Sequence, residues 1–141
     1  MRTYYECDEF RIDHVSLSDG SRTTVWIMDM LERNTGKYRA EVIPSRSSDQ
    51  LIPKIKEFAP AHSIIFTDDW AGYRPLVGHG LQHHHVTHSA KEYSKKGVID
   101  GREMDIHINT IEGIHSSLRR KLLNRSRRDL DRIKLLLGEE I

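Results

Sequence analysis

Three acidic side chains are spaced along the chain so that a folded sheet could bring them together around metal ions. Asp8 lies in a strand-like stretch near the N-terminus, Asp68 directly follows a short apolar run, and Glu112 lies in a helical pattern. Two divalent ions about 3.5 to 4 Å apart can assist phosphodiester displacement, and they require several hard carboxylate oxygens on a rigid frame. We therefore expect these three carboxylates to bind two Mg²⁺ or Mn²⁺ ions and to be catalytic. A single acidic residue is more often an exposed surface charge, so the hypothesis depends on their joint placement.

The elements that must position these acids follow an order of strands first and helices later. Residues 37–43 alternate apolar and polar side chains, as a half-buried strand does, and residues 63–67 are a continuous apolar run typical of a central strand. The patterns predict strands at 4–12, 23–31, 37–43, 63–67 and 81–88, helices at 47–58, 70–77, 105–123 and 126–137, and a polar loop at 89–104.

This order predicts an α/β protein with the RNase H-like fold. Three antiparallel strands followed by αβ units would form a mixed five-stranded sheet flanked by helices. Reactive groups collect at the carboxyl ends of strands in open α/β sheets, and Asp68 stands at such an end. If the first and fourth strands are neighbours, Asp8 and Asp68 approach each other, and the helix can carry Glu112 over them.

The segment His107 to Leu122 has two side-chain stripes at helical spacing. The apolar stripe, expected to pack on the sheet, comprises Ile108, Ile111, His115, Leu118 and Leu122. The polar stripe, expected to face metal and phosphate, comprises Asn109, Glu112, Ser116 and Arg119.

Composition indicates one soluble domain spanning residues 1–141. The chain is 37% hydrophobic and 30% charged, and no apolar run approaches the roughly 18 residues that a membrane span needs. Without a secretion signal at the start, we expect an intracellular protein with no membrane association, in the cytoplasm or nucleoid of a bacterium or the nucleus of a eukaryote. The single cysteine, Cys7, excludes an internal disulfide and a cysteine-based zinc site.

Positive charge is concentrated near the C-terminus although the net charge is only +1. Between Arg119 and Lys134 there are eight lysines and arginines against two aspartates. This segment could be a solvated helix face or a phosphate-binding surface. The candidates for DNA contact are Arg119, Arg120, Lys121 and Arg125.

Histidines are clustered on the strand predicted at 81–88. Neighbouring side chains on a strand point to opposite faces, so His83, His84, His85 and His88 cannot all converge on one ion. The sequence therefore favours no dedicated metal site there.

Several segments resemble insertion-sequence transposases of the ISXO-like and Merlin-related group. The matching segments are CDEF, WIMDMLERNTGKYRAEVIPSRS, LIPKIKEF, IIFTDDWAGYRPL, GLQHHHVTHSAKEY and HINTIEGIHSSLRRKL, which together cover nearly the whole chain. The chain departs from the group's pattern at His115, where tryptophan is usual, at Ile108 for threonine, at Thr87 for asparagine and at Arg119 for lysine.

The resemblance implies an RNase H-like DDE catalytic core with Asp8, Asp68 and Glu112 as metal ligands. Some relatives use asparagine as the final ligand, so Asn109 is the alternative third ligand, and His88 and His107 are implied as supporting residues. The implied partners are transposon ends and target DNA, and a homodimer stays open. A complete transposase would also have an upstream DNA-recognition region, which we expect this chain to lack.

These observations favour a transposase catalytic domain that cleaves DNA and transfers strands at transposon ends with metal ions. Two alternatives remain. One is a non-transposing nuclease with the same fold, and the other is an inactive or truncated remnant that only binds DNA.

Overall fold

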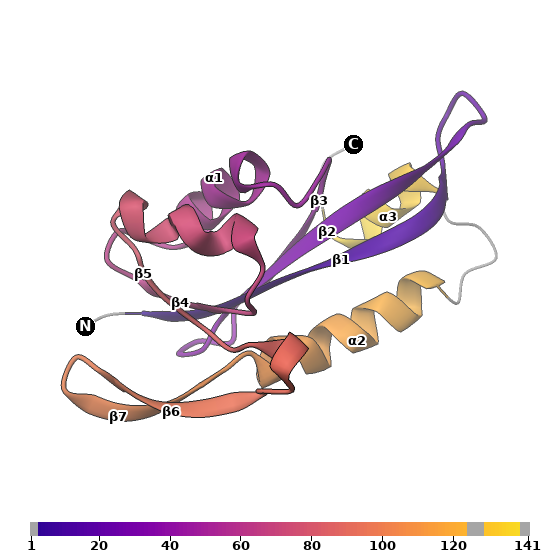
Figure 1. Ribbon diagram of the computed structural model, residues 1–141. Coiled ribbons are helices and arrows are strands. Elements are labelled where there is room, and N and C mark those ends of the chain that lie inside the picture. The colour runs from indigo at the N-terminus through magenta and orange to yellow at the C-terminus, as the bar shows by residue number, and fades with distance from the viewer. Residues whose placement is uncertain (1–2, 124–128, 139–141) are drawn as a thin grey trace.

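The computed structural model describes residues 3–123 and 129–138, and its elements form one five-stranded sheet, a separate hairpin and covering helices (Figure 1). The strands are β1 (Tyr4–Ser16), β2 (Arg22–Glu32), β3 (Tyr38–Ile43), β4 (Ile64–Thr67), β5 (Gln82–His85), β6 (Ser94–Ile99) and β7 (Arg102–His107). The α-helices are α1 (Ser48–Phe58), α2 (Asn109–Leu123) and α3 (Leu130–Leu136), and two 3₁₀ helices are η1 (Ala71–His79) and η2 (His88–Ala90). In this described part, no helix is both long and apolar enough to cross a membrane.

The central sheet has the strand order β3-β2-β1-β4-β5 and confirms the predicted mixed topology. β1, β2 and β3 pair antiparallel, whereas β4 and β5 run parallel to β1. The pairing of β1 with β4 is short, because it runs only from Tyr4 opposite Ile64 to Glu6 opposite Phe66. Beyond this point β1 and β4 no longer pair.

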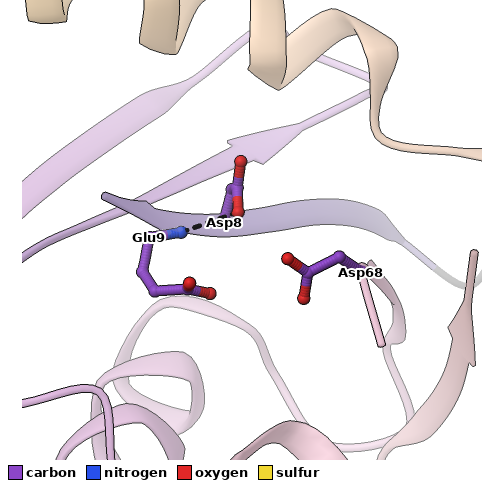
Figure 2. A group of neighbouring side chains, drawn as sticks. All are labelled: Asp8, Glu9 and Asp68. Carbon is purple, nitrogen blue, oxygen red and sulfur yellow. Dashed lines mark hydrogen bonds between the residues drawn. The ribbon is translucent and has the colours of Figure 1, made fainter. Parts of the chain in front are cut away.

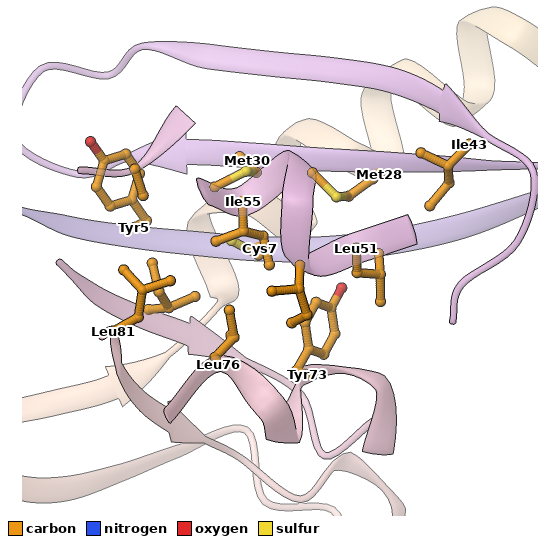
Figure 3. Packing of buried hydrophobic residues seen from close by; sticks show 13 residues of the cluster. Tyr5, Cys7, Met28, Met30, Ile43, Leu51, Ile55, Tyr73, Leu76 and Leu81 are labelled. Carbon is orange, nitrogen blue, oxygen red and sulfur yellow. The ribbon is translucent and has the colours of Figure 1, made fainter. Parts of the chain in front are cut away.

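The two faces of the sheet carry different helices. On one face, Cys7 and Met30 of the strands meet Leu51 and Ile55 of α1 and Leu76 of η1 (Figure 3). On the other face, Phe10 and Ile12 belong to a core shared with Leu122 of α2 and Ile133 of α3. Alternate residues of β1 therefore point to opposite layers, with even-numbered residues from Glu6 to Phe10 facing α2.

The predicted polar loop at 89–104 is wrong, because most of it forms the β6–β7 hairpin. Val98 pairs with Glu103 and Ile99 with Arg102 across a turn made by Asp100 and Gly101. Both turn residues have positive φ, at 52° and 78°, as the common two-residue hairpin turn requires. Burial of Ile99 and Ile106 against Phe66 and Val86 attaches the hairpin to the main sheet.

The helix predicted at 105–123 begins at Asn109, because residues 102–107 belong to β7. The backbone N–H of Asn109 donates to Nδ1 of His107 at 3.0 Å, which satisfies a free donor at the first turn. The expected packing stripe is confirmed, since Ile108 and Ile111 are fully buried. Within the helix predicted at 126–137, α3 covers only the later part, and residues 124–128 lie outside the described residues. The strand predicted at 81–88 is reduced to β5, and the segment at 70–77 is the 3₁₀ helix η1.

Candidate active site

Asp8 and Asp68 lie together at the open edge between β1 and β4. Each stands two residues beyond the last residue pair of the two strands, Glu6 with Phe66. One carboxylate oxygen from Asp8, one from Asp68 and one from Glu9 all lie within 4.8 Å of one another (Figure 2). The expected approach of Asp8 to Asp68 is thus present in the structure, and it follows directly from the strand register.

Glu9 is the member of this acidic cluster that the sequence did not single out. Its side chain points toward the η1 side of the sheet, where Tyr73 donates a hydrogen bond to Oε1 at 2.7 Å. Nη1 of Arg46 lies 3.5 Å from Oε2. The backbone N–H of Glu9 also donates to Oδ1 of Asp8 at 2.9 Å, so Glu9 helps to hold the first aspartate.

Glu112 lies on the first turn of α2, beside the cluster but outside the group that approaches within 4.8 Å. Its Oε1 is 3.5 Å from Nε2 of His88, and its side chain is 39% exposed. Burial raises the pKa of Glu112, and the negative charges of Asp8 and Asp68 raise it further against the opposing effect of His88. Glu112 is therefore electrically coupled to both aspartates. Asn109 is exposed at the start of the same helix.

Burial disfavours the ionised form of two members of the acidic cluster. Burial raises the pKa of Glu9 to about 8, with Asp68 and Asp8 adding to the effect. Burial likewise raises the pKa of Asp68, although Trp70 opposes this by donating its backbone N–H to Oδ1 at 3.0 Å. Mg²⁺ prefers oxygen ligands such as carboxylates, and a bound cation would favour their ionised form. The residues therefore fit a hard divalent cation.

A buried ion pair fixes the start of α2. Glu6 is fully buried, and its Oε1 accepts a hydrogen bond from the N–H of Ile111 at 3.0 Å. Its Oε2 accepts from Nε of Arg33 at 2.7 Å, and Nη2 of Arg33 donates to the carbonyl of His107 at 2.6 Å. Because Ile111 precedes Glu112, this pair determines where Glu112 stands relative to the aspartates.

His115 contacts the first aspartate from α2, a role hidden by its place in the apolar stripe. Its Nδ1 lies 3.1 Å from Oδ2 of Asp8 and 3.8 Å from Oδ1 of the buried Asp29. Its ring packs on Phe10 with the ring centres 4.2 Å apart. Burial raises the pKa of Asp29 to about 8, even though nearby His115 opposes this. The histidine thus packs on Phe10 and at the same time contacts the carboxylate of Asp8.

The remaining expected residues lie at different distances from the acids. His88 stands beside Glu112, and His107 contacts the start of α2. The basic residues described on α2 are exposed near its C-terminal end: Arg119, Arg120 and Lys121. They lie two or more turns beyond Glu112 along the helix. Arg125 lies outside the described residues.

Comparison with known proteins shows the family of this chain. The family model of the ISXO2-like transposase domain matches residues 7–125, which include most of β1, the acidic cluster and α2. The chain belongs to the ISXO2-like transposase family. Among curated proteins, none matches the sequence significantly.

A solved structure shows that this transposase domain shares its fold with a retroviral integrase. The HTLV-2 integrase catalytic core domain, solved in complex with magnesium in a dimeric form, superposes with a TM-score of 0.50 at 13% sequence identity. The match covers 95% of this chain and 81% of the integrase chain. At so low an identity the likeness concerns the fold alone, which is the RNase H-like fold.

Proposed function

We propose that this chain catalyses metal-dependent DNA cleavage and strand transfer at transposon ends. The observation that carries the proposal is the meeting of Asp8 and Asp68, with Glu9 within 4.8 Å, in a chain of a transposase family. Family membership indicates a polynucleotidyl-transferase type of enzyme. The acidic cluster supplies the oxygen donors that such chemistry requires.

In this proposal Asp8, Asp68 and Glu112 are the metal ligands. Two Mg²⁺ or Mn²⁺ ions bound there would activate water for cleavage and a DNA 3′-hydroxyl for joining, and would stabilise the leaving oxygen. The N–H of Glu9 and the ring of His115 hold the carboxylate of Asp8 from two sides. Asn109 is the alternative third ligand, and its exposed position one helical turn before Glu112 supports keeping it in the test.

The proposed substrate is DNA, held in part by the basic end of α2. Arg119 is seven residues beyond Glu112, and a rise of 1.5 Å per residue separates them by about 10 Å along the helix axis. Arg119, Arg120 and Lys121 would thus contact phosphates away from the cleaved bond, mostly without reading sequence. Two transposon ends must be joined to one target, so we include a homodimer in the proposal. The dimeric form of the integrase core supports this choice.

The test is Mg²⁺-dependent nicking and strand transfer by the wild-type chain on DNA carrying the transposon ends. Asp8→Asn should abolish both reactions, because an amide replaces a charged ligand. Glu112→Gln and Asn109→Ala identify the third ligand, since only loss of the true ligand removes activity. Glu103→Gln on β7 is the matched control, because Glu103 is an exposed acid outside the cluster.

The products separate the proposal from its alternatives. Cleavage without joining would assign a nuclease that does not transpose. DNA binding with steep salt dependence but no metal-dependent turnover would assign an inactive remnant. If Mg²⁺ neither binds nor raises the melting temperature of the wild type, the proposed metal site is wrong.

A further inference from the structure

A single arginine stands beside the acidic cluster and is held there from several sides. The guanidinium carbon of Arg46 lies 3.7 Å from the ring centre of Trp70 and 4.8 Å from that of Trp26. Its Nη1 is 3.5 Å from Oε2 of Glu9, and a carboxylate oxygen of Glu9 lies within 4.8 Å of one from each aspartate. The side chain is nevertheless 38% exposed. Arg46 is thus a fixed cation at the edge of the candidate centre.

The surroundings are built to fix this arginine in place. The indole Nε1 of Trp70 donates to the carbonyl of Arg46 at 2.7 Å, so one tryptophan holds both the backbone and the guanidinium. Gly72 makes room for this contact, since a Cβ there would lie 2.8 Å from the same carbonyl. Ser48 donates to the carbonyl of Gly72 at 2.8 Å and links the segment to α1. Trp70 in turn donates its N–H to Asp68, which ties this arrangement to the metal-ligand candidate.

The guanidinium keeps donors free for a further partner. Among the residues the structure describes, it makes an ionic contact with Glu9 but no hydrogen bond. The indoles cover the guanidinium group, while its five N–H donors point outward in its plane. Such a planar fork matches the oxygens of a phosphate, and being held in advance lowers the entropy cost of binding.

We propose that Arg46 binds a backbone phosphate of the substrate DNA next to the bond that is cleaved. The inference rests on the proposed function, since it takes the acidic cluster as the cleavage centre. Neutralising Glu9 alone would not require two aromatic rings and a glycine to orient a half-exposed side chain. Arg46 contacts the carboxylate of Glu9, which lies beside the two aspartates. The basic end of α2, in contrast, is about two helical turns from Glu112. The two cationic groups would therefore hold different parts of the strand.

Arg46→Met is the main test variant, because methionine can keep apolar contact with the indoles without the charge. We expect its affinity for duplex DNA to fall roughly tenfold to a hundredfold, as for loss of a charge-assisted contact. The slope of log affinity against log salt should shrink by about 1, the value for one lost phosphate contact. Arg46→Lys should keep the slope and lose part of the affinity. Arg102→Ala on the β6–β7 hairpin removes an equal charge from an exposed position and should change neither value.

The contacted phosphate is located with DNA carrying one neutral methylphosphonate at successive positions around the cleavage site. One substitution should weaken binding by the wild type and have no further effect on Arg46→Met. Melting temperatures of both Arg46 variants show that the fold is intact. An unchanged salt slope in folded Arg46→Met, or equal penalties at every methylphosphonate position in both proteins, would overturn the inference.

The binding measurements need no turnover, so the two hypotheses fail separately. If the wild type nicks DNA with Mg²⁺ while Arg46→Met binds as the wild type does, only the phosphate contact is wrong. If the wild type never nicks DNA but Arg46→Met loses one phosphate contact, the cleavage function is wrong and the DNA-binding role of Arg46 stands.

Discussion

Replacing Glu6 by alanine should destabilise the protein strongly and loosen the helix that carries Glu112. The Glu6 side chain is fully buried, and it pairs at 2.7 Å with Arg33, whose side chain is only 19% exposed. Removing one partner of a buried pair leaves the other charge without compensation and costs about 3–5 kcal/mol. A domain has only about 5–15 kcal/mol of total stability, so Glu6→Ala should lose a large part of it.

Glu6→Gln separates the charge of Glu6 from its shape. Glutamine can still accept the hydrogen bond from Ile111 N–H, which Glu6 accepts at 3.0 Å, but it loses the charge that pairs with Arg33. We expect a smaller loss of about 1–3 kcal/mol. Ile111 anchors the helical turn that carries Glu112. Mg²⁺ should therefore raise the melting temperature of both variants less than it raises that of the wild type.

Urea unfolding at constant m-value measures these losses, and Asp105→Ala is the matched control. Asp105 forms an equally short ion pair with Lys96 at 2.7 Å, but both side chains are more than half exposed. Water screens such a pair, so the urea midpoint of Asp105→Ala should stay close to that of the wild type. If Glu6→Ala lowers the midpoint no more than Asp105→Ala does, the buried pair does not anchor α2.

Three further predictions concern single substitutions. Asp29→Asn should stabilise the protein on the order of 3 kcal/mol at pH 8, because burial raises the pKa of Asp29 to about 8 and asparagine carries no charge to bury. The gain in unfolding free energy should vanish toward pH 4, as urea unfolding across this range can measure. The melting temperature of His83→Gln should rise relative to that of the wild type as the pH falls from 6.5 to 4. Burial lowers the pKa of His83 to about 4, so in this pH range only the unfolded histidine takes up a proton, which destabilises the wild type. Gly72→Ala should cost about 1–3 kcal/mol in urea and weaken DNA binding as Arg46→Met does, since its Cβ meets a carbonyl, whereas Gly113→Ala has open space and should be neutral or slightly stabilising.

The closeness of Asp8 and Asp68 could be predicted, because it follows from strand patterns that are visible in short stretches of the sequence. An apolar run that ends in an acid predicts a central strand with its reactive group at the carboxyl end, and β4 ends at Thr67, directly before Asp68. The first strand then needed only to be its neighbour. Parallel register brings Asp8 to the same level, two residues beyond the last pair.

The role of Glu9 could not be predicted, because strand alternation places it on the face opposite Asp8. Its carboxylate reaches the cluster only because β1 and β4 stop pairing after Glu6 and leave an opening between them. Its partners Tyr73 and Arg46 come from distant parts of the chain. No sequence spacing encodes such a contact, which depends on how η1 packs against the sheet.

The β6–β7 hairpin was missed although a local signal was present. Asp100 and Gly101 form the turn, and this dipeptide is a strong hairpin signal between alternating strands. The two strands are rich in charged residues, so the composition of this segment resembled that of a loop. They are also largely exposed, with Val98 72% exposed. Ile99 and Ile106 are buried against the main sheet, and this tertiary burial stabilises strands whose own pattern is weak.

The acidic cluster gives a physical reason to expect that metal binding and stability are linked. Burial raises the pKa values of Glu9 and Asp68, and the neighbouring acids raise them further, so keeping these carboxylates ionised in the folded protein costs free energy. Arg46 contacts Glu9 at 3.5 Å and His115 contacts Asp8 at 3.1 Å, and a bound divalent cation would add positive charge beside both aspartates. Mg²⁺ should therefore raise the melting temperature of the wild type more than that of Asp8→Asn, whose cluster repels less and binds metal less. An equal rise in both proteins would show that Mg²⁺ stabilises the fold at some other place.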